Sequence, residues 1–198
     1  MSKFNLNERG NENRTAVFNN GIAGRVENVR IEVSKKGSAD ADNVPDYRLT
    51  VTDENGAQIN QGFYYHKDNS MNSPEKNEAN AGYLVDRVLS AARAVVPEDF
   101  VFPDVDDANS AIDTLFNIIR QHSSDKTVTV YTTYGTKEKP SKYLGLRFFD
   151  FIEKTGNTGY SRLNPRGNDQ MERLVEDAPK DPSSNTSDTA KTAGGWGA

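Results

Sequence analysis

The sequence predicts a mainly β domain that is interrupted by two helices and followed by a polar tail. Three features of the 198-residue chain indicate this organisation. Apolar and polar residues alternate in several short stretches, and apolar residues recur at helical spacing between residues 74 and 122. Beyond residue 154 the composition becomes too poor in apolar residues to form a core. At this length we expect one domain with one sizeable core.

The first strand is expected over residues 21–34. Val29, Ile31 and Val33 share one face of it, and Arg30 lies on the other. Gly24 near its beginning is suited to a bend or a bulge. The preceding residues, 1–20, are polar and rich in asparagine, which indicates a polar N-terminal arm.

The second and third strands are predicted to form a hairpin. Residues 47–52 alternate between apolar and polar side chains, and the turn sequence DENG follows, in which Gly56 is suited to a positive φ. Residues 59–67 then complete the hairpin and end in the aromatic and basic sequence GFYYHK. Neighbouring rings in that sequence point to opposite faces, so some of them must belong to the core.

Two helices are expected between the third and fourth strands. Ser73 and Pro74 are typical of the N-cap and first turn of a helix, which the apolar spacing carries to about residue 96. A second apolar stripe ends near residue 122, and Asp104 or Asp106 is the expected cap of that helix.

The last two strands are expected over residues 127–134 and 142–154, on either side of a lysine-rich turn. The first is almost wholly β-branched or aromatic and is predicted to be half-buried. In the second, alternation places Leu146 and Phe148 toward the core and Tyr143, Arg147 and Phe149 on the opposite face. A single bulge would exchange Phe149 for Phe148.

Composition excludes several kinds of site. The chain has no cysteine and two histidines, so disulfides and thiolate metal sites are excluded, and we expect neither a metal nor a cofactor. None of the common nucleotide-binding or hydrolase motifs is present, and we expect no enzymatic activity and no catalytic residue. No apolar run approaches the roughly 20 residues that span a bilayer, which favours a cytoplasmic protein without a membrane partner.

The negative charge is unevenly distributed along the chain. The formal net charge is −5, and the residues beyond 166 carry six acidic and three basic side chains, a net charge of −3. The first 166 residues therefore carry only −2. Any site for a polyanion must accordingly be a local patch rather than a general positive field.

Aromatic and basic side chains gather around the last hairpin. Rings stack on the bases of single-stranded nucleic acid whatever the sequence, and Lys and Arg neutralise its phosphates. The candidate binding residues are Tyr131, Tyr143, Arg147 and Phe149 on the strands, Lys137, Lys139 and Lys142 at the turn, and Tyr64, His66, Arg48 and Arg30 on the neighbouring strands. The alternative for any single ring is core or cross-strand packing.

Five strands with two helices between the third and fourth fit a five-stranded OB-like Greek-key barrel. The acidic tail carries one aromatic residue, Trp196, near its end. In this layout the chain resembles bacteriophage-type single-stranded DNA-binding proteins of the OB-fold family. The resemblance implies an arm over residues 1–20, an OB-like binding domain over 21–154 and a flexible, disordered acidic tail over 155–198.

The resemblance also implies a function. Such a protein coats and protects single-stranded DNA in phage replication, recombination and repair, within the cytoplasm of the bacterial host. Its tail, with Trp196 as the contact residue, would bind replication or recombination proteins, and assembly of a homo-oligomer on DNA is one arrangement that the family allows. RNA remains an alternative ligand, because stacking does not distinguish the two sugars. The competing hypothesis is a non-enzymatic protein-binding module, such as a virion component or an inhibitor of a host enzyme.

Overall fold

The computed structural model describes residues 16–35, 44–157 and 159–174. Most of the predicted arm and Trp196 lie outside these ranges. The described chain begins with a short 3-10 helix, η1 (Phe18–Gly21). Its strands are β1 (Gly24–Lys35), β2 (Tyr47–Thr52), β3 (Gln58–Phe63), β4 (Thr127–Gly135), β5 (Pro140–Leu146) and β6 (Ile152–Lys154). Its α-helices are α2 (Pro74–Val95) and α3 (Ala108–His122).

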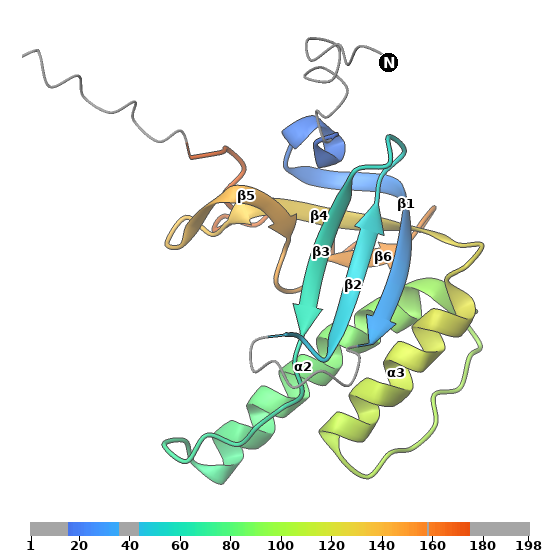
Figure 1. The fold of residues 1–198 in the computed structure, drawn as a ribbon, viewed down its shortest axis with the longest axis vertical. Helices are drawn as coiled ribbons and strands as arrows, with labels where there is room; N and C mark the ends of the chain where they lie inside the picture. The colour runs from blue at the N-terminus through green and yellow to red at the C-terminus, as the bar shows by residue number, and fades with distance from the viewer. Residues whose placement is uncertain (1–15, 36–43, 158, 175–198) are drawn as a thin grey trace, which may run out of the picture.

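The strands form one antiparallel sheet of six strands, which confirms the mainly β prediction (Figure 1). The order is β3-β2-β1-β4-β5, and β6 pairs with β4 as well. The chain after the two helices therefore returns to lie beside β1. β3 and β5, at the two ends of this order, come into contact. They are not paired within the described residues, so the sheet is not closed into the predicted barrel.

β1 is divided between two partners by a bulge. Its first half, up to Arg30, pairs with β4, and its second half, from Arg30 onward, pairs with β2. The register with β4 shifts between Val26 and Val29, where Asn28 has a φ of 57°. The bulge therefore lies inside the strand and not at Gly24. Because bulges increase local twist, this one turns the β2–β3 hairpin away from the line of β4.

The predicted alternation of the first two strands is confirmed, whereas the third strand, β3, ends at Phe63 and not at residue 67 as predicted. Val29 and Ile31 of β1 and Leu49 and Val51 of β2 are buried on one face of the sheet. The residues that alternate with them, such as Arg30 and Arg48, lie on the outer face. The DENG turn has the expected conformation, with Gly56 at a φ of 78°.

Both helices cover the buried face of the sheet. Ser73 caps α2 as predicted, because its side chain accepts a hydrogen bond from the backbone N–H of Lys76. The cap of α3 is Asp107, not Asp104 or Asp106. Phe116 of α3 stacks on Tyr47 of β2 with ring centroids 4.3 Å apart. Among the described helices, none has the length and apolar composition that a membrane crossing requires.

β4 is buried on both faces, which corrects the prediction of a half-buried strand. Every residue from Val128 to Tyr134 is buried. The second face is covered by residues 159–171, in which Leu163 is only 2% exposed. The backbone N–H of Tyr134 donates to the carbonyl of Gln170, and Thr136 forms a β-bridge with Asp169. The domain boundary expected at residue 154 is therefore too early, because the domain extends to about residue 171.

The single strand predicted over residues 142–154 is two strands, which raises the number from five to six. Tyr131 of β4 is bonded on both sides of the break. Its carbonyl accepts a hydrogen bond from the N–H of Arg147, and its N–H donates to the carbonyl of Phe151. The three residues between, 148–150, have no place in the ladder and form an outward bulge, with Asp150 at a φ of 47°.

One carboxylate joins α3 to β1, to β2 and to the segment that follows β3. Oδ1 of Asp113 accepts hydrogen bonds from the hydroxyls of Tyr47 and Tyr65, and Lys35 Nζ lies 3.1 Å away. Burial acts to raise the pKa of Asp113, but the hydrogen bonds from the two tyrosines and Lys35 outweigh it and lower that pKa. The ionised carboxylate is therefore the form that stabilises the fold.

We expect Asp113→Ala to lower the free energy of unfolding at pH 7 by about 1–2 kcal/mol, because two tyrosine hydroxyls lose their acceptor. The difference from wild type should close as the pH falls below about 3.9, because a lowered folded pKa gives stability that is lost on protonation. Urea denaturation followed by circular dichroism between pH 7 and pH 3 measures both effects. Asp99→Ala, an exposed loop residue, is the control. Equal stabilities of the two variants at pH 7 would show that the Asp113 bonds contribute nothing.

Candidate functional site

Three adjoining hollows open beside α2, the bulge at 148–150 and the segment 160–169. Their volumes are about 420, 660 and 370 Å³. The first two share Phe149 and Arg166, and the first and third share Asp150, Arg162 and Arg166, so the three form one continuous surface. We call this surface the groove, and its aromatic and freely accessible basic residues are Tyr83, Arg93, Lys139, Tyr143, Phe148, Phe149, Tyr160, Arg162 and Arg166.

Exposed aromatic rings are concentrated in the groove. Tyr143 is 70% exposed and Phe148 59%, and Tyr83, Phe149 and Tyr160 are also exposed. Phe149 meets Phe148 at right angles with centroids 4.5 Å apart, and Tyr83 edge-on at 5.9 Å. Exposed rings gathered in this way mark an interaction site rather than ordinary surface.

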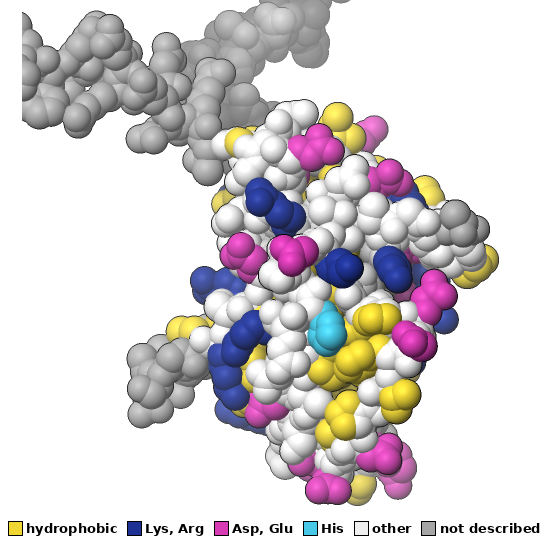
Figure 2. All heavy atoms as spheres, turned by 90° about the vertical axis from the view of Figure 1, so that its right-hand side faces the viewer, with side chains coloured by type: hydrophobic (Ala, Val, Ile, Leu, Met, Phe, Trp, Pro, Cys, Tyr) yellow, Lys and Arg dark blue, Asp and Glu magenta, His cyan; other side chains and the backbone are white. Residues whose placement is uncertain are grey.

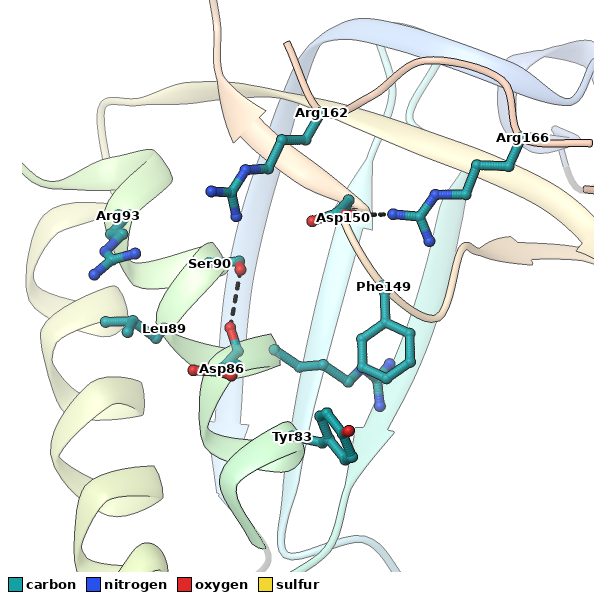
Figure 3. A pocket seen from close by; sticks show the side chains of 10 residues that line it. Tyr83, Asp86, Leu89, Ser90, Arg93, Phe149, Asp150, Arg162 and Arg166 are labelled. Carbon is teal, nitrogen blue, oxygen red and sulfur yellow. Dashed lines mark hydrogen bonds and ion pairs between the residues drawn. The ribbon is translucent and has the colours of Figure 1, made fainter. Parts of the chain in front are cut away.

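Basic side chains line the same hollows as these rings. Arg93 comes from α2, Lys139 from the β4–β5 turn, and Arg162 from the segment that covers β4. Arg166 forms an ion pair with Asp150, which Figure 3 shows across the bulge. For Arg93, Lys139 and Arg162, no acidic partner lies within ion-pair distance among the described residues. Their positive charge is therefore available to an anionic ligand.

The buried side chain of Arg147 holds the bulge in place. Its guanidinium donates to the backbone carbonyls of Phe149 and Asp150, which are in the bulge. It also donates to the carbonyls of Arg162 and Asn164 in the covering segment. A fifth hydrogen bond, 3.1 Å long, reaches the buried carboxylate Oδ2 of Asp169. One side chain thus holds the bulge and the covering segment together.

Two of the predicted binding residues are in the interior instead of on the surface. Arg147 is 4% exposed and Tyr131 is 1% exposed, with the guanidinium 4.2 Å from the centroid of the tyrosine ring. The Tyr131 hydroxyl lies against the sulfur of Met171. The alternation that placed both residues on one face is correct, but that face is covered by residues assigned to the tail. Neither side chain is accessible to a base or a phosphate in this structure.

The structure brings the other residues of the last hairpin together. Tyr143, Phe149 and Lys139 line the same hollow. Lys137 and Lys142 are exposed nearby, and Lys142 Nζ lies 5.4 Å from the centroid of the Tyr143 ring. Phe148, which was predicted to face the core, is exposed like Phe149, because both residues lie in the bulge.

The predicted residues from the other strands line none of the three hollows. Arg30 and Arg48 are exposed on the outer face of β1 and β2, and Tyr64 follows β3 with its ring exposed. His66 lies near the start of α3, where its backbone is bonded to Asn109 and its ring Nε2 is 3.0 Å from Asp68 Oδ1. Their part in binding stays a prediction.

Five groove residues were missed in the sequence: Tyr83 and Arg93 on α2, and Tyr160, Arg162 and Arg166 in the covering segment. A signal for the first two was present. Tyr83, Asp86, Ser90 and Arg93 recur at helical spacing, and this stripe runs beside the apolar one. The signal for the other three was only local charge, because nothing in their spacing indicates that the segment folds back over β4.

A different surface lies along the connection between α2 and α3. Hydrophobic side chains gather on this side of the molecule, which Figure 2 shows face on. Val101 and Val105 are exposed there, and a separate hollow of about 160 Å³ lies between the two helices beside Phe102. Its ring cluster, formed by Phe100, Phe102 and His122, is half-buried, unlike the exposed rings of the groove.

The comparisons with known proteins give no family: no family model, curated protein or solved structure significantly matches the chain.

We expect Arg147→Met to lower the free energy of unfolding by about 3–5 kcal/mol, because it leaves the carboxylate of Asp169 buried without its partner. Urea denaturation followed by circular dichroism measures the loss. Arg166→Met removes an exposed ion pair and should cost no more than about 1 kcal/mol. Adding Asp169→Asn to Arg147→Met should restore part of the stability. If Arg147→Met is as mild as Arg166→Met, Arg147 is not the support of the bulge.

Proposed function

We propose that the protein binds single-stranded DNA independently of sequence and that the groove is the interface. The observation that carries the proposal is the gathering of five exposed rings and several exposed basic side chains along three adjoining hollows. Stacking on an aromatic ring contributes about 1–3 kcal/mol per base and requires no particular sequence. Bases inside a duplex are already stacked on one another, so the single strand is the form that the rings select.

The arrangement of the strands supports this proposal. β1, β2 and β3 follow one another and β4 returns beside β1, which is the spatial order of a Greek key. The contact of β3 with β5 is compatible with a partly open five-stranded barrel of the OB type, to which β6 would be an addition. In OB folds the turn between the fourth and fifth strands contacts oligonucleotides. Here that turn carries Lys137 and Lys139 and borders the groove.

In the cell, the protein would coat and protect single-stranded DNA in phage replication, recombination and repair. This setting rests on the resemblance in layout, as do the host cytoplasm as its location and assembly into a homo-oligomer on DNA. The acidic tail, with Trp196, would bind replication or recombination proteins. No cofactor or catalytic step is part of this function.

A non-enzymatic protein-binding module is the second candidate function. The apolar side chains around Val101 and Val105 favour it, because exposed apolar patches mark protein contacts. Salt separates the two functions. Binding to phosphates releases counterions, so the affinity for DNA falls steeply as salt is added, whereas an apolar contact is far less sensitive.

We expect a labelled oligo-dT strand to bind more tightly than its duplex form, and more weakly as salt is raised from 50 to about 200 mM. The double variant Tyr143→Ala/Phe149→Ala should lose at least about tenfold in affinity, because two stacking rings are removed. Fluorescence anisotropy measures each affinity. The same titration with oligo-U tests whether RNA is bound as well.

Val101→Ala/Val105→Ala is the matched control for loss of exposed apolar surface and should bind like wild type. Arg48→Ala/Tyr64→Ala, measured in parallel, tells whether the strand also crosses the outer face of β2 and β3. Absence of binding by the wild-type protein at low salt would rule out the DNA-binding function and favour the protein-binding module. Equal binding by the wild type and the Tyr143→Ala/Phe149→Ala variant would place the interface outside the groove.

A further inference from the structure

A buried arginine without a partner lies at the base of the groove. Arg87 of α2 is 7% exposed and lines the hollow of about 420 Å³. Its guanidinium carbon is 4.0 Å from the centroid of the Phe148 ring and 5.0 Å from that of Phe63. It makes no hydrogen bond or ion pair with any residue that the structure describes, and its buried Nε–H has no acceptor among them.

An unpaired buried guanidinium is unusual, because a charge removed from water needs a counter-charge or hydrogen-bond acceptors. The contacts with the faces of aromatic rings supply part of the attraction that water would give. They leave the buried Nε–H of the guanidinium without an acceptor among the described residues. Burial lowers the pKa of Arg87 to about 10, so the side chain is still charged at neutral pH. An anion that enters the hollow would provide what is missing.

The contrast with Arg147 shows that the chain does pair a buried arginine elsewhere. Arg147 has the carboxylate of Asp169 and four backbone carbonyls as acceptors. Arg87 is buried almost as deeply and has none of these. Both side chains border a hollow of the groove, but only Arg147 has its acceptors within the described chain.

The other residues of the hollow suit an anion with an aromatic neighbour. Arg93, Arg162 and Arg166 line it together with Arg87, against two acidic residues, Asp86 and Asp150. The four arginines and two aspartates give a net charge of +2. Figure 3 shows Arg93 and Arg162 toward one end of the hollow, and the rings of Tyr83 and Phe149 close to each other at the opposite end.

We infer that this hollow, the arginine pocket, binds the phosphate group of a nucleotide through Arg87, Arg93 and Arg162, with the attached base against Tyr83 and Phe149. Guanidinium groups bind phosphate oxygens in pairs, which gives several of them in one pocket a preference for phosphate over a spherical anion. A volume of about 420 Å³ is in the range of pockets that hold small ligands. The phosphate can belong to an internal position of a strand or to a 5′-phosphorylated end. That a strand is its source rests on the proposed function, but phosphate binding itself does not.

The first test uses inorganic phosphate, which contains no base and no strand. In ¹H–¹⁵N NMR spectra of the full chain, the Nε–H signal of Arg87 should shift as phosphate is added, and should not shift with sodium chloride at the same ionic strength. Thymidine monophosphate should bind at least about tenfold more tightly than thymidine, because charge-assisted hydrogen bonds to the phosphate are added.

Variants then locate the site. Arg93→Gln and Arg162→Gln change exposed side chains, so both should fold normally and each should weaken binding of thymidine monophosphate by at least about threefold. Arg87→Met keeps the apolar stem and should abolish the preference for thymidine monophosphate over thymidine. Arg120→Gln, an exposed arginine at the end of α3, is the matched control and should bind like wild type.

Comparison of phosphorylated and unphosphorylated strands identifies the source. A 5′-phosphorylated oligo-dT that binds at least about threefold more tightly than the same strand with a 5′-hydroxyl assigns the pocket to a strand end. Equal affinities, both lowered by Arg93→Gln, assign it to internal phosphates.

The outcomes for the pocket and for DNA binding are separable. If oligo-dT binds in the groove but neither phosphate nor thymidine monophosphate is affected by the arginine variants, the arginine pocket is refuted while the proposed function stands. If phosphate binds at Arg87 but no strand binds, the proposed function fails and the pocket remains as a site for a free nucleotide. Binding of an acidic peptide in place of both phosphate compounds would refute the pocket as a nucleotide site.

Discussion

The buried guanidinium of Arg147 is the interaction on which the candidate site depends. It binds the carbonyls of the bulge at 148–150 from one side and those of the covering segment from the other, with Asp169 as its counter-charge. A buried guanidinium of this kind is stable only when all of its acceptors are present, because a missing acceptor leaves part of its charge unpaired. The bulge and the covering segment therefore depend on each other. A loss of either segment would remove the support of the other.

The bulge also explains how an aromatic surface arises beside a central strand. Tyr131 accepts a hydrogen bond from Arg147 and donates one to Phe151, so the ladder resumes after the interruption and the sheet is not disturbed. The three residues between have no sheet partner, and two of them are Phe148 and Phe149. Regular strand geometry would place these two rings on opposite faces. The bulge instead exposes both, next to Tyr83 of α2.

Charge is arranged at the same small scale. The protein is acidic overall, with a net charge of −5, yet four arginines line the first hollow of the groove. Two of the arginines in this region, Arg87 and Arg147, are buried, and they differ in the number of hydrogen-bond acceptors. Arg147 has five acceptors within the chain and acts as a support. Arg87 has none among the described residues, and its guanidinium lies against the rings of Phe148, Phe63 and Phe151 at the edge of the first hollow.

Local pattern in the sequence determined most of the helices and strands. The alternation of β1 and β2, the Ser73 cap of α2, the Gly56 turn and the two apolar helical stripes could all be predicted. Each of these features depends on residues that are only a few positions apart. It also determined that Tyr143, Phe149 and the turn lysines lie near one another. Tertiary structure decided which of the candidate side chains are accessible. Tyr131 and Arg147 became interior because residues 159–171, polar enough to be taken for tail, cover β4 with Leu163 and Asp169 buried among them. It also brought α2 beside the bulge, a contact between residues more than 60 positions apart, which no local spacing encodes.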